Sequence, residues 1–591
     1  MPGWRYAFSL SGEAVKAATP PGTVLLIEHS VAQPGGRYVD LVAKYPLPTS
    51  DPADPLNWPQ WKKVTCMSTL SFYAFVSNYI SAAIAPALSA WNPSFPKDPK
   101  PTHELVELVA FNVLLLGLAN VLCVPLANIF GRRAVLVISN AVLFVATVCG
   151  MCLEGFDINL AIRVFQGIGS AASETVSPAM VGDLFFVHER GSWMAIYTAS
   201  LASGSVIGGI TGGYIANGLG WFKMYWVSAA LTGISCFGTV FLVPETIYDR
   251  GEHSLPIERN LPRPSRYCPR TRTPVPYLSL VTLPSIRLTL PSRFKWSGES
   301  TPGLTWYQTS SSGDLASSSS STPPGRFPKH ESFPDPPTTT SIEYPPFTYT
   351  QSLRFGEYRG NIWHQFKKPW FTLRLPVTWI VMAQYGGLVG GVVVISTVGP
   401  QILSLPPYGW GENTGLLFLG ALVGIIFGAV FTGMLVDQRL KKLARSEDHG
   451  YAEPEGRIPV MLPSLAIGTG GLLLFGFCAE YPGKYRWLGL EFAYGMVAFA
   501  LTQVPSIWFS YLIDSYNQLA SDCFVMICIL RGIIPFAWTF FVVQWVEHDG
   551  YLIPFVGFTV IMAVFSLLIL PVMCFGKRMR IATARYVVGN Q

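Results

Sequence analysis

Residues 104–127 read ELVELVAFNVLLLGLANVLCVPLA, a run in which two glutamates and two asparagines are the only strongly polar residues. The hydrocarbon core of a bilayer is about 30 Å thick, and about 20 helical residues cross it. Stretches of this kind recur from Val64 to Phe575. We place spans near residues 64–88, 104–127, 134–153, 160–182, 192–216, 223–243, 376–401, 413–436, 458–478, 486–511, 522–545 and 552–575. The sequence therefore predicts an all-α polytopic membrane protein with 12 transmembrane helices.

The composition supports this fold class and excludes several functions. Half of the 591 residues are hydrophobic, 13% are charged and the mean hydropathy is +0.36, which excludes a water-soluble protein. The net charge of +6 arises mainly in loops and tails, where membrane orientation explains it, so we expect no nucleic-acid partner. No phosphate-binding loop, metal-ligand set or nucleophile motif is present. We therefore expect a protein that is not an enzyme, uses no ATP and needs no metal or cofactor.

The predicted spans fall into two groups of six, separated by a long stretch rich in Pro, Ser, Thr and Arg. We expect an N-terminal tail at residues 1–62, six-helix bundles at 63–250 and 374–576, a disordered central loop at 251–373, and a C-terminal tail at 577–591. Residues 253–329 are unpatterned even for a linker. They are either a regulatory loop or a retained intron in the gene model, and the sequence leaves both open.

Lysine and arginine residues indicate the orientation in the membrane. With the N-terminus inside, most of them lie in cytoplasmic segments and few lie in external loops. An even number of spans then places both termini in the cytoplasm. We expect a multi-pass protein of the plasma membrane.

A similar local pattern follows the second span of each half. Residues 126–133 read LANIFGRR and residues 433–439 read GMLVDQR. These resemble the loop motif of the major facilitator superfamily, whose fold consists of two six-helix bundles. The resemblance implies that Arg132, Arg133 and Asp437 latch the cytoplasmic side.

The fourth span carries the most specific pattern. Residues 163–169, RVFQGIG, resemble a motif of the same superfamily, and the continuation through residues 182–191, GDLFFVHERG, is similar to its fungal twelve-helix drug:proton antiporter-like branch. Arg163 and Glu174 are 11 residues apart, about 16 Å of helical rise, and therefore share one face with Ser170. A carboxylate within a span is costly unless it faces the bundle interior. We expect Glu174 to carry an exchangeable proton and Arg163 to tune its proton affinity, although a structural ion pair is the alternative.

The fifth span contains small residues at every fourth position, including Gly208 and Gly212, which permit close helix contact. The pattern resembles the antiporter motif of exporters, with Gly209 at the usual place of a proline. We assign Gly208 and Gly212 to gating.

Other polar residues within the spans are candidates for a substrate cavity, which in this family is lined by the first, fourth, seventh and tenth helices. These candidates are Asn78, Gln166, Ser170, Gln384, Tyr385 and Gln503. Arg531 lies about ten residues into its span, and we expect Asp514 or Asp522 to neutralise it.

The resemblance implies a proton-coupled secondary transporter that exports drugs or toxic metabolites by alternating access. Its partners would be a small-molecule substrate, protons and the lipid bilayer, and we expect a monomer. One alternative is proton-driven uptake of polyamine-like organic cations. Another is a membrane sensor that keeps the fold without transporting.

Overall fold

The apolar runs of the sequence form long helices in the computed structural model of the chain. The structure describes residues 3–32, 38–42, 44–49, 51–248, 361–446 and 450–588, with the single positions 348, 351, 353 and 358. The helices of the first half are α3 (Gln60–Ala83), α6 (Glu107–Leu118) continued by α7 (Asn120–Phe130), α8 (Arg132–Cys149), α9 (Phe156–Leu184), α10 (Val187–Leu219) and α11 (Trp221–Leu242). Those of the second half are α14 (Pro376–Ser404), α15 (Phe418–Ser446), α16 (Met461–Glu480), α17 (Arg486–Tyr516), α18 (Ala520–Asp549), and α19 (Leu552–Leu567) followed by α20 (Ile569–Val588).

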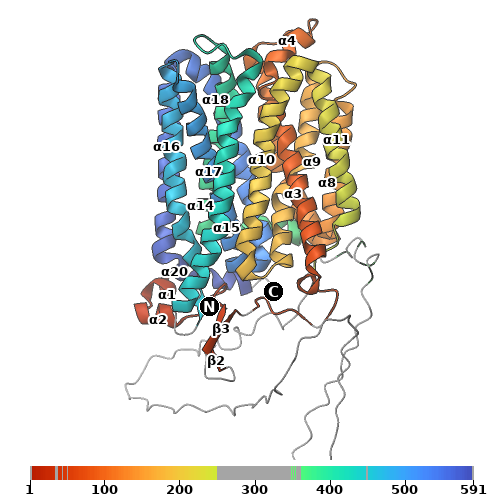
Figure 1. Cartoon of the computed structure of the whole chain (residues 1–591). Helices are drawn as coiled ribbons and strands as arrows, with labels where there is room; N and C mark the ends of the chain where they lie inside the picture. Colours follow the sequence, from red (N-terminus) through yellow and green to blue (C-terminus); the bar gives the residue numbers. More distant parts are fainter. Residues whose placement is uncertain are drawn as a thin grey trace, which may run out of the picture. The chain divides into compact units, whose positions relative to one another are not determined.

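These helices run side by side, and the described chain begins and ends at the same end of the bundle (Figure 1). We call this the terminus end. Two termini at one end agree with an even number of crossings. The side of the membrane that the terminus end faces stays a prediction.

Ten helices among the described residues are long and apolar enough to cross a membrane. The other two predicted spans correspond to α3 and α9, whose 24 and 29 residues extend about 36 and about 44 Å. Their central parts are less apolar than those of the other ten, and α9 carries Arg163 and Glu174 well inside its length. Most of α9 is buried inside the bundle, and Arg163 and Glu174 are buried with it and kept away from lipid.

Burial separates interior helices from peripheral ones. The most apolar part of α14 is 94% buried and that of α17 is 89% buried, whereas the corresponding part of α19 and α20 is only 22% buried. The first two therefore form the interior of the second half, and the last faces outward.

Close packing joins the helices of the first half. A Cβ atom at Gly208 of α10 would overlap the carbonyl oxygen of Tyr79 in α3, and one at Gly212 would overlap that of Ala83. Glycine at this spacing therefore lets the two backbones touch.

Short elements connect the spans or precede them. They are α1 (Trp4–Ser9), α2 (Gly12–Ala17), β1 (Val24–Leu25), β2 (Ile27–Ala32), β3 (Tyr38–Val42), η1 (Pro55–Asn57), η2 (Leu88–Ala90), α4 (Trp91–Ser94), α5 (Thr102–Leu105), α13 (Ile362–Phe371), η5 (Thr372–Arg374), η6 (Gly411–Leu417), β4 (Tyr451–Ala452), η7 (Pro454–Val460) and η8 (Asn517–Leu519). β1 pairs antiparallel with β4, and β2 pairs antiparallel with β3.

The predicted disordered loop at 251–373 falls mostly outside the described residues, including all of 253–329. Its last part is ordered, however, because Ile362–Phe371 form α13. Apolar and aromatic residues at positions 362, 363, 366 and 370 give this stretch a helical period that the Pro- and Ser-rich composition upstream conceals.

Candidate functional site

A cavity lies between the two halves. It is formed by α3, α6 and α10 from the first half and by α14, α15, α17 and α18 from the second. Most lining residues are apolar. The polar ones are Asn78, Ser81, Ser205, Tyr385, Ser396, Tyr494 and Arg531. Among the described residues that line it, Arg531 is the only charged one, so the cavity suits an apolar molecule with a few polar groups.

A buried ion pair lies at the edge of this cavity. Glu174 of α9 is completely buried, and its carboxylate pairs with the guanidinium of Arg531 in α18. The Nδ2 atom of Asn78 in α3 donates a hydrogen bond of 3.0 Å to Glu174 Oε1. The guanidinium also lies 5.1 Å from the ring centre of Tyr385 in α14. Because α9 belongs to the first half and α18 to the second, the pair joins the two halves.

Arg531 has donor capacity left over. Its Nε atom is buried and has no hydrogen-bond partner among the described residues, although the side chain lines the cavity. An unpaired buried donor is unfavourable, and an acceptor on a bound molecule would satisfy it. Arg531 is therefore both a partner of Glu174 and a candidate substrate contact.

The prediction that Asp514 or Asp522 neutralises Arg531 is wrong. Asp514 instead pairs with Arg190 and with Arg457, the latter at 2.8 Å. Asp522 joins no ion pair among the described residues and lies nine residues from Arg531 on α18, about 13 Å along the axis. Sequence proximity pointed to these carboxylates, whereas the opposite half presents Glu174 at the same depth.

Arg163 is held by main-chain oxygens and does not contact Glu174. It donates to the carbonyls of Ile80 and Ser81 near the end of α3, at 2.9 Å each, and to that of Leu108 in α6 at 3.0 Å. Its remaining bond, of 2.9 Å, goes to Oε1 of Gln166. A cation at the C-terminal carbonyls of a helix is favourable. In this structure Arg163 therefore clamps three helices of the first half together.

Of the six predicted cavity residues, the structure places Asn78 and Tyr385 in the cavity lining. Gln384 instead bridges helices: its Nε2 donates to the Phe565 carbonyl at 3.0 Å, and its Oε1 accepts from Trp508 Nε1 at 2.8 Å.

Three further candidates lie in the packed interior of the bundle. Gln166 is bonded to Arg163, and Gln503 accepts from Ser464. The Ser170 hydroxyl is buried with no hydrogen-bond partner among the described residues. None of the three lines the cavity that the structure describes.

At the terminus end, polar contacts close the space between the halves. Asp437 of α15 accepts from the backbone N–H and the hydroxyl of Ser192 in α10, at 3.0 and 2.7 Å. Arg190 of α10 pairs with Asp514 of α17, and Arg457 of η7 donates to the Val187 carbonyl at 2.9 Å. The cavity is thus closed at this end, and we call these contacts the latch.

The predicted latch residues Arg132 and Arg133 bind groups of the first half, and Arg133 also donates to the carbonyl of Leu353, in the segment between the halves. Arg132 pairs with Asp183 at the end of α9, and Arg133 donates to the Val243 carbonyl at 3.0 Å. Both backbone N–H groups donate to the carboxylate of Glu245, at 3.2 and 3.1 Å. Asp437 does cross between the halves, but its partner is Ser192.

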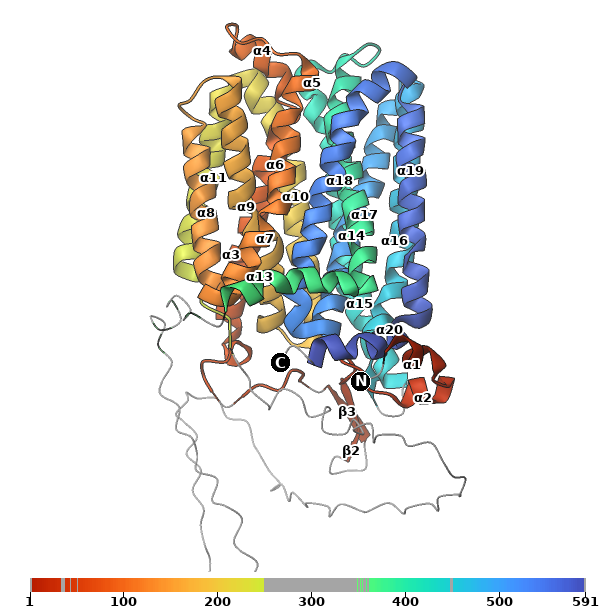
Figure 2. The same ribbon diagram turned by 180° about the vertical axis from the view of Figure 1, so that it is seen from behind.

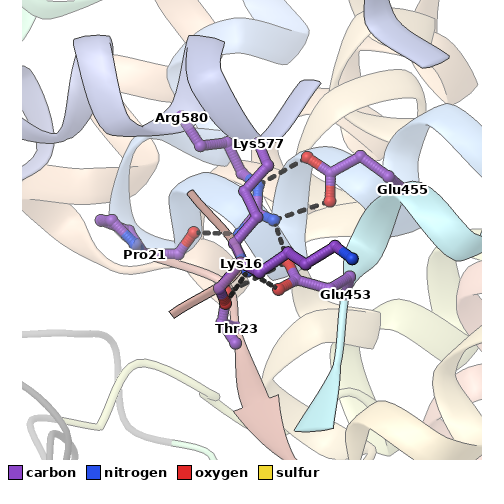
Figure 3. A network of polar contacts seen from close by, with 7 residues as sticks. All are labelled: Lys16, Pro21, Thr23, Glu453, Glu455, Lys577 and Arg580. Carbon is purple, nitrogen blue, oxygen red and sulfur yellow. Dashed lines mark hydrogen bonds and ion pairs between the residues drawn. The ribbon is translucent and has the colours of Figure 1, made fainter. Parts of the chain in front are cut away.

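A network around Arg580 fixes the N-terminal segment, residues 3–27, to the second half (Figure 3). The guanidinium of Arg580, in α20, bonds Glu455 at 2.6 and 2.7 Å and also pairs with Glu453. It donates to the carbonyl of Pro21 at 2.9 Å and to the hydroxyl of Thr23 at 3.2 Å. Burial alone would raise the pKa of the Glu453 carboxyl, but nearby cations, first of all Arg580, hold this pKa below its ordinary value.

The N-terminal segment reaches the latch. Gly22 has φ +93° and lies so close to the backbone of Asp514 that a Cβ atom would be 2.8 Å from its carbonyl oxygen. Val24 packs in one buried cluster with Val187 of α10 and Leu440 of α15. The segment therefore contacts both halves where they meet.

Comparisons with known proteins agree with this architecture. Residues 65–516 match the sequence model described as Major Facilitator Superfamily. Protein HOL1 of Saccharomyces cerevisiae is 24% identical over 92% of this chain and 91% of its own length. Efflux pump radE of Floropilus chiversii is 20% identical, covering 85% of this chain and 78% of the pump. The solved structure of the proton:xylose symporter XylE is similar in fold, with a TM-score of 0.53, 14% identity, and coverage of 86% of this chain and 95% of the symporter.

Proposed function

The chain belongs to the major facilitator superfamily of membrane transporters, and we propose that it exports small, largely apolar organic molecules in exchange for protons by alternating access. Export is supported by relatives named as efflux pumps, among them radE and vrtL of Penicillium aethiopicum. The apolar cavity lining supports the substrate class.

One observation carries the proposal of proton coupling: the buried pair of Glu174 and Arg531 joins the two halves beside the cavity. A proton on the Glu174 carboxylate would remove its charge and with it the attraction across the halves. Protonation would thereby change the relative stability of the two conformations between which the halves rock.

Substrate and proton are linked through shared residues. Asn78 and Arg531 both contact the Glu174 carboxylate, and both line the cavity. A molecule that forms a hydrogen bond with either side chain changes the contact between that side chain and the Glu174 carboxylate. It thereby changes the affinity of the carboxylate for a proton. This linkage is reciprocal, since the proton alters substrate affinity by the same factor.

The latch supports an order of events. In this structure the halves are closed at the terminus end by Arg190 with Asp514 and by Ser192 with Asp437. If the terminus end is cytoplasmic, as we propose, Glu174 receives its proton from outside in this state. The latch then breaks, and the cavity opens to the cytoplasm to take up substrate.

Uptake of polyamine-like cations is less well supported. It needs a free carboxylate facing the cavity, whereas Glu174 is already engaged by Arg531. The sensor alternative depends on a central loop that lies mostly outside the described residues.

Inside-out membrane vesicles that contain the full chain test the direction and the driving force. With an acidic lumen, we expect a neutral apolar dye, Nile red, to accumulate inside, and accumulation should stop when an ionophore collapses the pH gradient. Labelled spermidine driven toward the cytoplasmic face would favour the polyamine alternative. Dye accumulation that persists without a pH gradient would contradict proton coupling.

A further inference from the structure

Helix α13 crosses the terminus end of the bundle. It runs across the spanning helices rather than along them (Figure 2). It contacts α7 of the first half and α18 of the second. It therefore bridges the seam between the halves at the level where α7 ends and α18 begins.

One face of α13 turns toward the protein and the other is exposed. Pro369 is buried on the inner face. On the outer face Trp363 is 74% exposed, Trp370 is 55% exposed and Phe371 is 45% exposed. Rings of this size facing water on one helix are unfavourable, which indicates that something covers them.

Basic side chains lie among these rings. Lys367 is exposed four residues after Trp363, which places both on the outer face. Arg374, exposed in η5, lies 5.1 Å from the ring centre of Phe371. Residues 361–379 contain three Lys or Arg and no Asp or Glu. The partner must therefore offer an apolar layer for the rings beside a negatively charged layer.

We infer that the outer face of α13 binds anionic phospholipids of the adjoining leaflet. Helices of this kind lie in the membrane plane with Trp and Phe among the upper acyl chains and Lys and Arg at the headgroups. Because α13 contacts both halves, the bound lipids lie at the seam that must move during transport. The inference concerns the membrane contact alone and stands whether or not the chain exports its substrate.

Lipid binding to the purified full chain tests the charge requirement. Phosphatidylserine and phosphatidylcholine are titrated separately, and retained lipids are counted by native mass spectrometry. For Lys367→Gln with Arg374→Gln we expect weaker phosphatidylserine binding, about fivefold for each basic residue removed. The matched control is Lys442→Gln with Arg445→Gln, the same charge change on the exposed end of α15, which should bind like the wild type.

The position of the rings is tested in nanodiscs containing brominated phosphatidylserine or brominated phosphatidylcholine, which quench indole fluorescence on contact. The difference in quenching between the wild type and the variant Trp363→Phe with Trp370→Phe reports on these two rings. We expect this difference to be larger with brominated phosphatidylserine than with brominated phosphatidylcholine. Thermal unfolding verifies that every variant is folded. Equal phosphatidylserine binding by the Lys367 and Arg374 variant and its control, or equal quenching by both lipids, would overturn the inference.

Discussion

The pair of Glu174 and Arg531 makes a quantitative prediction about stability. The two side chains are 0% and 7% exposed, so water screens neither charge. Replacing one member of a buried pair leaves the other charge uncompensated, at a cost of about 3–5 kcal/mol. Glu174→Gln keeps an acceptor for Asn78 and removes only the charge. We therefore expect it to lower the free energy of unfolding by about 3–5 kcal/mol.

Replacing Arg531 alone and replacing both residues together complete a double-mutant cycle. Arg531→Met leaves a buried carboxylate without its cation, so we expect a similar loss of about 3–5 kcal/mol. Glu174→Gln with Arg531→Met removes both charges, and we expect its stability to lie within about 1 kcal/mol of the wild type, because buried pairs are often replaceable by neutral side chains. The strong departure from additivity identifies the interaction.

The assay is unfolding in mixed micelles by titration with sodium dodecyl sulfate, followed by circular dichroism. Glu491→Gln is the control, since this half-buried carboxyl joins no ion pair among the described residues and its loss should cost under about 1 kcal/mol. A double variant destabilised by the sum of the two single changes would refute the pairing.

Three further predictions concern the latch, the helix packing and the N-terminal segment. Arg190→Ala removes the pair with Asp514, so the free energy of the closed arrangement at the terminus end should rise by about 1.5–3 kcal/mol relative to the open one. Spin labels on the two halves at this end should then report a larger population of long distances. Gly212→Leu forces a side chain against the Ala83 carbonyl, and thermal unfolding should show a loss of at least about 1–3 kcal/mol. The pKa of Glu453 is held below 4.5, so its contribution to stability is complete above that pH and is lost as the pH falls through the lower folded value. The hydrogen-exchange protection of the N-terminal segment, measured against the intrinsic exchange rate at each pH, should then decrease.

The first two predictions have matched controls, and the third has a confirming variant. Arg445→Ala removes an exposed cation from the same end and should leave the label distances unchanged. Gly218→Ala places a Cβ atom in open space, so no overlap with a neighbouring backbone should lower the unfolding temperature. Glu453→Gln should accelerate exchange already at neutral pH. Equal behaviour of variant and control in the first two cases, or wild-type exchange in Glu453→Gln, would contradict the corresponding contact.

The fold class could be predicted from the sequence because the length and hydropathy of each span identify it without knowledge of the other spans. Even α3 and α9, the two most polar spans, could be predicted as membrane-spanning helices. The signal in α9 is the superfamily pattern from Arg163 to Gly169. The major facilitator fold is confirmed by the family match and by the structural likeness to XylE.

The partners of charged residues were not predictable in the same way. Arg531 binds a carboxylate 357 positions earlier in the chain, and only the packing of the two halves brings them together. The docking of the N-terminal segment likewise depends on α20 and on residues 451–455, none of which has a strong local pattern. By contrast, α13 had a readable signal in its aromatic and basic spacing, which the Pro- and Ser-rich composition upstream obscured.

The role of Glu174 as the exchangeable proton site is tested most directly by comparing the wild type with Glu174→Gln in sealed vesicles loaded with the same dye. The wild type should accumulate dye against its gradient when a pH gradient is imposed. The variant should equilibrate dye between the two sides without accumulating it. Accumulation by the variant at the wild-type level, with the same dependence on pH, would contradict the proposed mechanism.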